Sequence, residues 1–272
     1  MNVRRAAAVM GSAALAMLFL LPLVMTVHSS LMSAEELAVV YRSETPYRWM
    51  PYRVTMEGYW NLLFASQTYL ATFWNSMAIV IAVVALQALI SLVMGYSLAR
   101  ARFRGKSVLL FLYIMVMLTP FQVTLLPNYL LIRRMGLFNT WWALILPGAF
   151  APLGVFLMWQ FAKEVPSEMI EAAHMDTSSN LRVIFQLVAP NVKAGLLTVA
   201  ILAFAENWNM VEQPLILLED EWLYPLSIRL NSLGGSAMDI RFPGAVLYMI
   251  PAVLLYFIFE NEIVDGVRHI KL

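Results

Sequence analysis

The stretch EAAHMDTSSNLRVIFQLVAP, from Glu171 to Pro190, places charged, hydroxyl and amide side chains in the second half of a very apolar chain. The segments on both sides of it are long and hydrophobic. Apolar segments of that length are candidates for crossing a bilayer as helices, which leaves the polar stretch between them at one membrane face. What the polar stretch does depends on the protein that surrounds it.

The composition indicates an all-α integral membrane protein surrounded by lipid. Of 272 residues, 61% are hydrophobic and only 13% are charged, and the mean hydropathy is +0.72, whereas a soluble domain carries about a quarter charged residues. A net charge of +1 gives no indication of a nucleic-acid partner. The absence of cysteine excludes disulfides and thiol catalysis, and the histidines are too far apart in the sequence to suggest a metal site.

Six segments are long enough to cross about 30 Å of hydrocarbon as helices. They predict one transmembrane domain over residues 1–272. Its expected spans are Ala6–Val27, Phe73–Ala99, Ser107–Ile132, Trp141–Phe161, Val192–Val211 and Pro243–Phe259. The first segment follows Arg4 and Arg5 like a secretory signal, but its apolar run exceeds the usual length of about 7–15 residues, so we expect a retained anchor.

Basic residues predict that both termini are cytoplasmic. The cluster RARFRGK, Arg100–Lys106, is the strongest indication of an inner loop, although Arg133 and Arg134 favour the opposite orientation. In this topology residues 28–72 form an outer loop or cap, residues 163–191 form a cytoplasmic loop between spans four and five, and residues 260–272 form a cytoplasmic tail.

The cytoplasmic loop predicts a pair of short helices. Pro166 suits a first helical position, and Glu168 and Glu171 place negative charge near the positive end of the helix dipole. The spacing places four residues on one narrow face that another protein can approach closely: Met169, Ala172, Ala173 and Asp176. A helix lying on the membrane would instead carry lysines and large apolar residues, so docking to a partner is favoured over that alternative.

The second helix should follow a turn of capping residues that begins at Asp176 and Thr177. Pro190 closes the loop and begins span five. An apolar stripe of the second helix is predicted to face the chain's own helices and consists of Leu181, Ile184, Phe185 and Val188.

A second polar group lies in the outer part of span five. Glu206, Asn209 and Gln213 have a spacing that places them on one helical face. A carboxylate in lipid costs about 2.5–3.5 kcal/mol, so this face should contact protein or water. The group suits the hydroxyls of a sugar, and it equally suits pairing with a partner subunit.

The sequence EAAHMD, followed by Pro190, resembles the EAA signature of the membrane subunits of bacterial ABC importers. From about Tyr59 onward the chain also resembles the carbohydrate-type, maltose-transporter-like permeases of that family. The matching stretches are FWNSMAIVIAVVALQALISLVMGYSLARARFRGK (Phe73–Lys106), TPFQVTLLPNYLLIRRMGLFNTWWALILP (Thr119–Pro147), NWNMVEQPLIL (Asn207–Leu217) and IVDGVRHIKL at the C-terminus.

This resemblance implies a permease subunit in the inner membrane of a bacterium. Its partners would be a second homologous permease, two ATPase subunits that hold ATP and magnesium, and an external substrate-binding protein. The residues that would couple it to the ATPase are Glu168, Glu171, Ala172, Ala173, Asp176, Thr177 and Pro190. Thr177 stands where the family usually has glycine, and we expect a capped turn with negative φ to accommodate it.

The expected function is ATP-driven import of a sugar or oligosaccharide, with no cofactor bound by this chain. The sequence contains no zinc-protease helix, nucleophile elbow or paired-carboxylate pattern, so we expect no enzymatic activity of its own. The alternative is an ion-coupled secondary transporter that works without an ATPase, for which ionisable groups near the membrane midplane and inverted repeats would be typical.

Overall fold

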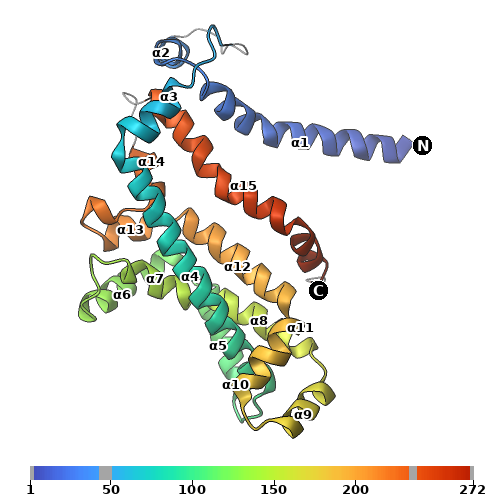
Figure 1. Ribbon diagram of the computed structural model, residues 1–272. Helices are drawn as coiled ribbons and strands as arrows, with labels where there is room; N and C mark the ends of the chain where they lie inside the picture. Colours follow the sequence, from blue (N-terminus) through green and yellow to red (C-terminus); the bar gives the residue numbers. More distant parts are fainter. Residues whose placement is uncertain (1–2, 43–50, 233–237, 270–272) are drawn as a thin grey trace. The chain divides into compact units, whose positions relative to one another are not determined.

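The computed structural model describes residues 3–42, 51–232 and 238–269, and these residues form helices and connecting turns without strands (Figure 1). The all-α prediction is confirmed. Residues 43–50 of the expected cap and residues 270–272 of the expected tail lie outside the described part of the chain. The described residues separate into two compact units. One combines the residues up to Thr72 with Arg229–Val253, and the other combines Phe73–Ile228 with the residues from Leu254 onward.

The first unit contains α1 (Val3–Ser29), α2 (Ala34–Arg42), α3 (Glu57–Trp60) and the π-helical turn η1 (Asn61–Ala65). It also contains the first turns of α4 (Gln67–Arg100), the end of α14 (Leu226–Ser232) and the first half of α15 (Met238–His269). Side chains far apart in sequence join these pieces, because the Tyr69 hydroxyl donates to the Gly244 carbonyl at 3.0 Å. Gly58 lies so close to α15 that a Cβ there would stand 2.4 Å from the Asp239 carbonyl oxygen.

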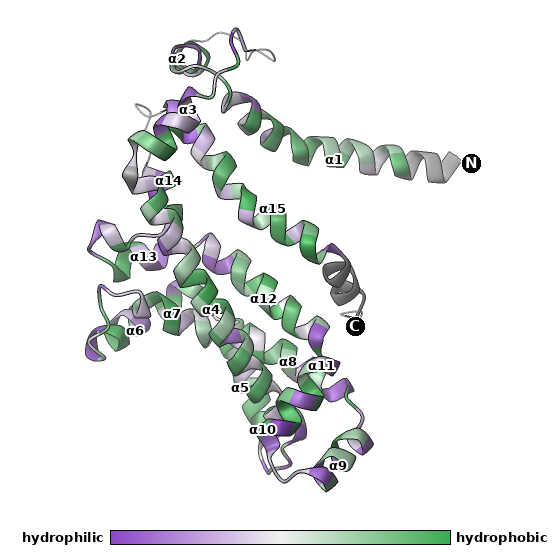
Figure 2. Ribbon diagram, viewed as in Figure 1, coloured by the Kyte–Doolittle hydropathy of each residue, from purple (hydrophilic) through white to green (hydrophobic). Residues whose placement is uncertain are grey.

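The second unit contains the polar segments singled out in the sequence. Its helices after α4 are α5 (Lys106–Met117), α6 (Phe121–Arg134), α7 (Trp142–Ala149), α8 (Pro152–Glu164), α9 (Ser167–Asp176), α10 (Asn180–Val183), π-helical η2 (Ile184–Val188), α11 (Ala189–Asn191), α12 (Lys193–Trp208), α13 (Glu212–Leu217) and the 3-10 turn η3 (Glu221–Leu223). Hydrophobic residues dominate α4, α5, α8 and α12, whereas hydrophilic residues gather on α9, on α10 and on α13 (Figure 2).

Candidate membrane spans number four in the described residues, or up to six if each of two bent helix pairs counts as one span. Unbroken candidates are Val9–Ser29, Thr68–Arg100, Trp142–Glu164 and Asp239–Glu260. They overlap the predicted spans one, two, four and six.

The predicted span three is not one continuous helix, whereas predicted span five, Val192–Val211, overlaps the single helix α12. In place of Ser107–Ile132 the structure has α5 and α6 at 98°, and α12 follows the segment Asn180–Asn191 at a bend of 85°. Pro120 explains the first bend, since proline lacks an N–H and disfavours helical geometry in the preceding residue. Val192, with φ −107° and ψ 23°, forms the second.

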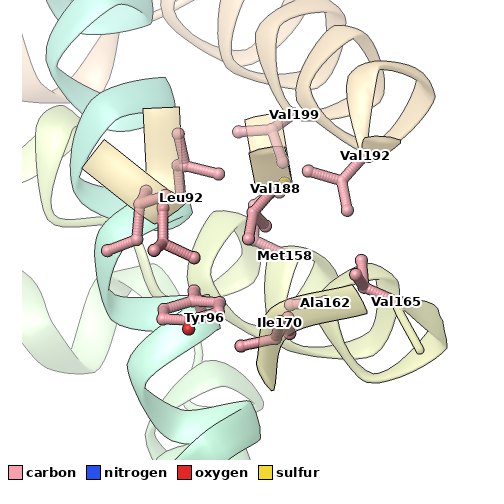
Figure 3. Close-up of a cluster of buried hydrophobic side chains, with 11 residues drawn as sticks. Leu92, Tyr96, Met158, Ala162, Val165, Ile170, Val188, Val192 and Val199 are labelled. Carbon is pink, nitrogen blue, oxygen red and sulfur yellow. The ribbon is translucent and has the colours of Figure 1, made fainter. Parts of the chain in front are cut away.

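A buried apolar cluster joins the segment between α8 and α12, called the polar insert below, to the long helices (Figure 3). Leu92 and Tyr96 of α4 meet Met158 and Ala162 of α8, and Val199 of α12 packs into the same cluster. The remaining buried members come from the insert and its flanks: Val165, Ile170, Val183, Ile184, Val188 and Val192. At about 25 cal/mol per Å² of apolar surface, this burial stabilises a fixed orientation of the insert on α4, α8 and α12.

Candidate functional site

The predicted helix pair forms. Helix α9 runs from Ser167 to Asp176 after Pro166, and α10 begins at Asn180. The turn between them fits its residues, because Thr177 has an extended backbone with φ −149° and needs no glycine. Ser179 caps α10 by accepting a hydrogen bond from the Arg182 N–H at 3.4 Å, and Thr177 Oγ1 accepts one from the Ser179 N–H at 3.3 Å. The expectation of a capped turn with negative φ is confirmed.

One face of α9 packs and the other is free. Ile170 is buried in the apolar cluster and Ala173 packs partly against it. Ala172 and Ala173, which were predicted to share one docking face, therefore have different surroundings. Ala172 is exposed, whereas Ala173 is half-buried against the cluster. Three further predicted coupling residues are exposed beside Ala172: Glu168, Glu171 and Asp176.

The predicted apolar stripe of the second helix is confirmed at Ile184 and Val188 and is wrong at Leu181 and Phe185. Val183, Ile184 and Val188 are buried, whereas Leu181 and Phe185 remain 59% and 46% exposed. Residues 184–188 are π-helical, and the wider turn of a π-helix changes which side chains share a face. Pro190 is exposed in α11, directly before the bend at Val192 that begins α12.

Arg100 holds the corner between α8 and α9, a role that the sequence analysis did not assign to it. Its guanidinium donates to the carbonyl oxygens of Ala162, at 3.2 Å, and of Val165, and to Ser167 Oγ at 3.3 Å. These carbonyls belong to the C-terminal end of α8, where carbonyl groups lack helical partners and a cation is favourable. The basic cluster was interpreted only as a sign of topology, although a basic residue in the last turn of a helix can also bond to carbonyls nearby.

Lys106 makes a similar contact at the other end of the basic cluster. Its Nζ donates to the carbonyl oxygens of Ala99 and Ala101 at 3.2 and 3.1 Å, at the C-terminal end of α4. The cluster therefore stabilises the helix ends beside the polar insert as well as carrying positive charge.

His174 joins α9 to α10. Its Nδ1 lies 2.8 Å from the Ile170 carbonyl oxygen and its Nε2 lies 3.0 Å from Asn180 Oδ1. Two acceptors are satisfied together only when both ring nitrogens carry protons. The hydrogen bond with Asn180, followed by that with the Ile170 carbonyl, raises the pKa of His174 above its ordinary value.

A hollow of about 320 Å³ lies between α9 and the helix that follows the turn. Asp176, Arg182 and Gln186 supply its polar groups, and Ala173 and Thr177 also line it. The exposed face of α9 thus adjoins a recess lined by one acidic and one basic side chain.

A larger cavity of about 810 Å³ lies within the helices of the second unit. Interruptions in the helices contribute to its wall: Thr119 between α5 and α6, Phe150 and Ala151 between α7 and α8, and Met210 between α12 and α13. At membrane depth, irregular backbone is tolerated only where protein covers it or where it lines a water-filled cavity.

Two of the three polar residues singled out in span five line the cavity. Glu206 and Gln213 both line it, Glu206 is exposed, and the buried Gln213 Oε1 has no hydrogen-bond partner. Asn209 does not line the cavity, and its Nδ2 donates to the Ala205 carbonyl at 2.8 Å. The predicted continuous helical face does not form, because α12 ends at Trp208 and α13 begins at Glu212.

Asn139 fixes the segment that follows Gln213. It is a non-glycine residue with positive φ, 57°, in the left-handed region that asparagine tolerates better than most residues. Its N–H donates to the Leu217 carbonyl at 3.0 Å, and its Oδ1 accepts from the N–H groups of Glu219 and Asp220 at 2.9 and 3.0 Å. These bonds tie the end of α13, and with it the wall that carries Gln213, to the turn before α7.

Comparison with known proteins identifies the family. Residues 87–268 match the model of the family described as binding-protein-dependent transport system inner membrane component. The chain is 31% identical over 219 residues to the arabinooligosaccharides transport system permease protein AraQ of Halalkalibacterium halodurans, covering 79% of this chain and 78% of that protein. It is 28% identical over 255 residues to the sulfoquinovosyl glycerol transport system permease protein SmoH of Agrobacterium fabrum, covering 91% and 86%.

A solved structure has the same fold. It is the crystal structure of a bacterial ABC transporter involved in the import of the acidic polysaccharide alginate, of which one chain superposes with a TM-score of 0.82 at 18% identity, covering 96% of this chain and 98% of that one. The resemblance drawn from the sequence motifs is confirmed. The chain belongs to the inner membrane components of binding-protein-dependent transport systems and is a non-enzymatic permease subunit of an ABC importer.

Proposed function

We propose that this permease carries a sugar or oligosaccharide inward, together with a second permease, two ATPase subunits and an external binding protein. The names of its relatives support a saccharide, since they include transport components for arabinooligosaccharides and maltodextrin. ATP and magnesium belong to the ATPase subunits in this proposal. An ion-coupled transporter that works alone is not favoured, because the matched family is binding-protein-dependent.

The proposed topology has six spans, with the bent pair α5 and α6 counted as span three and α12 as span five, and both termini lie in the cytoplasm of a bacterium. The basic residues Arg100–Lys106 then lie at the inner face beside α9 and α10. Residues 28–72 form the outer cap and residues 260–272 the inner tail.

Helix α9 is proposed to dock on the ATPase. Its exposed acidic and small side chains, Glu168, Glu171 and Ala172, offer a surface that a basic groove can approach. Asp176 and Thr177 line the adjacent hollow. Ala173 packs against the apolar cluster beneath α9, and Pro190 lies in α11 at the end of the segment. The buried cluster around Ile170 passes a displacement of α9 on to α4, α8 and α12.

The cavity is the proposed route of the solute, and the observation that carries this proposal is its wall of interrupted helices. Broken helices near the middle of the membrane form the binding sites of many transporters, because their free backbone groups and irregular turns can face a polar solute. Glu206 and Gln213 add side-chain oxygens to this wall. For Asn209, which lies outside the wall, a contact with the second permease is the more fitting role.

The test is Glu206→Ala in the complete transporter. If Glu206 contacts the solute, uptake of radiolabelled arabino- and malto-oligosaccharides into proteoliposomes should fall up to about tenfold, in line with loss of a hydrogen bond to a charged group, while the complex stays assembled in detergent. Glu212→Ala, an exposed glutamate outside the cavity wall, is the matched control. If Glu206 instead joins the two permeases, the complex should dissociate more readily before transport changes.

A further inference from the structure

Glu206 gives the cavity wall its single formal charge. Among the described residues that line the cavity, no lysine, arginine or histidine accompanies this carboxylate. An acidic solute in the cavity would meet Glu206 without a cation to offset the repulsion, and in a partly enclosed space with apolar walls such repulsion is stronger than in water.

Two threonine hydroxyls of the wall offer hydrogen-bond acceptors. Thr119 and Thr124 donate their hydroxyl protons to the carbonyl oxygens of Met115 and Phe121, at 2.9 and 2.8 Å, so each hydroxyl oxygen keeps lone pairs that can accept a hydrogen bond. The hydroxyl groups of a sugar can donate to these two threonine oxygens, whereas a carboxylate, phosphate or sulfonate, which only accepts, cannot.

Apolar surface surrounds these polar groups. Phe121 and Phe150 line the cavity, and Phe150 is 61% exposed. A few placed polar groups on a mainly hydrophobic wall are typical of sites for small organic ligands, and the C–H face of a sugar ring packs well on an aromatic ring.

We propose that the cavity accepts hydroxyl-bearing solutes without negative charge and rejects acidic ones such as uronates, sugar phosphates and sugar sulfonates. This selectivity rests on the proposed role of the cavity as the solute route. The shared fold with an importer of an acidic polysaccharide does not transfer that substrate, because selectivity resides in the lining side chains and not in the fold.

Charged thiol reagents test the proposal without knowledge of the natural solute. The chain has no cysteine, so Asn128→Cys places one thiol on the cavity wall. The complete transporter in lipid nanodiscs, which expose both membrane faces, is treated with a cationic and an anionic methanethiosulfonate reagent. Modification of this chain is followed by mass spectrometry, and each rate is divided by the rate of the same reagent with 2-mercaptoethanol in solution.

The normalised rate should be about tenfold higher for the cationic reagent than for the anionic one, as expected for a nearby unpaired negative charge. In the Asn128→Cys, Glu206→Gln double variant the same ratio should fall to about threefold or less. Equal rates in the single variant, or a faster anionic reagent, would overturn the proposed selectivity while leaving an aqueous cavity in place.

Failure of the proposed function gives a different result. If neither reagent modifies the thiol in the folded complex, but both do so after denaturation, water does not reach the cavity, and the solute route and its selectivity both fail. Thr124→Cys provides a second thiol on the same wall, so that a folding defect in one variant does not decide the outcome. The same charge preference at both positions supports the proposal.

Discussion

The guanidinium of Arg100, at the end of α4, donates a hydrogen bond to the carbonyl oxygen of Val165, at the end of α8. A further bond to the Ala162 carbonyl and one to Ser167 Oγ complete the contact. Arg100 thus connects a long helix to the residues that lead directly into α9. It is a positioning residue for the helix proposed to meet the ATPase.

Arg100→Lys should weaken the contact between the end of α4 and the junction of α8 and α9, although it keeps the charge. Lysine lacks the planar guanidinium group, whose several N–H donors reach several acceptors at once. Loss of hydrogen bonds from a charged donor costs about 1.5–3 kcal/mol. We expect a lower thermal midpoint of the purified complex and a smaller stimulation of ATP hydrolysis by the binding protein. Arg102→Lys, at an exposed position of the same cluster, is the control. If neither variant has an effect, the cluster acts through its charge alone, because both changes keep the charge.

Ala172→Trp and Ala173→Trp should have different effects, because only Ala172 is exposed. Ala172→Trp should leave the free energy of unfolding within about 0.5 kcal/mol of the parent and should uncouple uptake from ATP hydrolysis by blocking the docking face. Ala173→Trp overpacks the apolar cluster and should cost about 1–3 kcal/mol. Thermal unfolding and uptake, measured on the same preparations, check both. Normal uptake in Ala172→Trp would contradict docking through this face.

Thr177→Gly should bring no gain in stability. The extended backbone of Thr177 carries no strain for glycine to relieve, and glycine adds entropy to the unfolded chain and removes the oxygen that accepts from the Ser179 N–H. The expected loss is about 0.5–1 kcal/mol, with uptake close to that of the parent. A clear rise in the thermal midpoint would show that the turn is strained.

Contact between α9 and α10 should weaken as the pH rises. The pKa of His174 is raised in the folded chain, so its contribution is complete below the unfolded pKa of about 6.5 and disappears as the pH rises through the higher folded pKa. Hydrogen exchange of residues 170–180, corrected for intrinsic rates, should show protection falling as the pH is raised from 6 to 8. Asn180→Ala removes the larger cause of the shift and should move the transition to lower pH. A transition that Asn180→Ala leaves in place would contradict this assignment.

Composition and hydropathy sufficed to predict the class of fold and the position of the helix pair, because lipid imposes long apolar helices and any polar interruption is conspicuous. The bend before Phe121 was missed although Pro120 was visible. A proline within an apolar segment fits both a kinked span and a broken one, and packing decides between them.

The candidate site was predicted less completely, for geometric reasons. A constant period of 3.6 residues placed Leu181 and Phe185 inward, but both are exposed, and the helix widens into a π-helical turn at Ile184–Val188 that changes the period at Phe185. The same assumption aligned Asn209 with Glu206, although α12 ends between them. Arg100 was invisible as a positioning residue because its acceptors are main-chain carbonyls more than 60 residues away, which no side-chain pattern records.

Helix α12 can act as a lever. It is embedded at its beginning in the apolar cluster and carries Glu206 near its end. From Lys193 to Glu206 the rise of 1.5 Å per residue gives an arm of about 20 Å. A pivot of about 10° at the embedded end therefore swings the carboxylate by roughly 3 to 4 Å over such an arm, which is enough to exchange one set of hydrogen-bond partners for another. If Glu206 contacts the solute as proposed, a small rotation at the embedded end of α12 is therefore enough to make or break that contact.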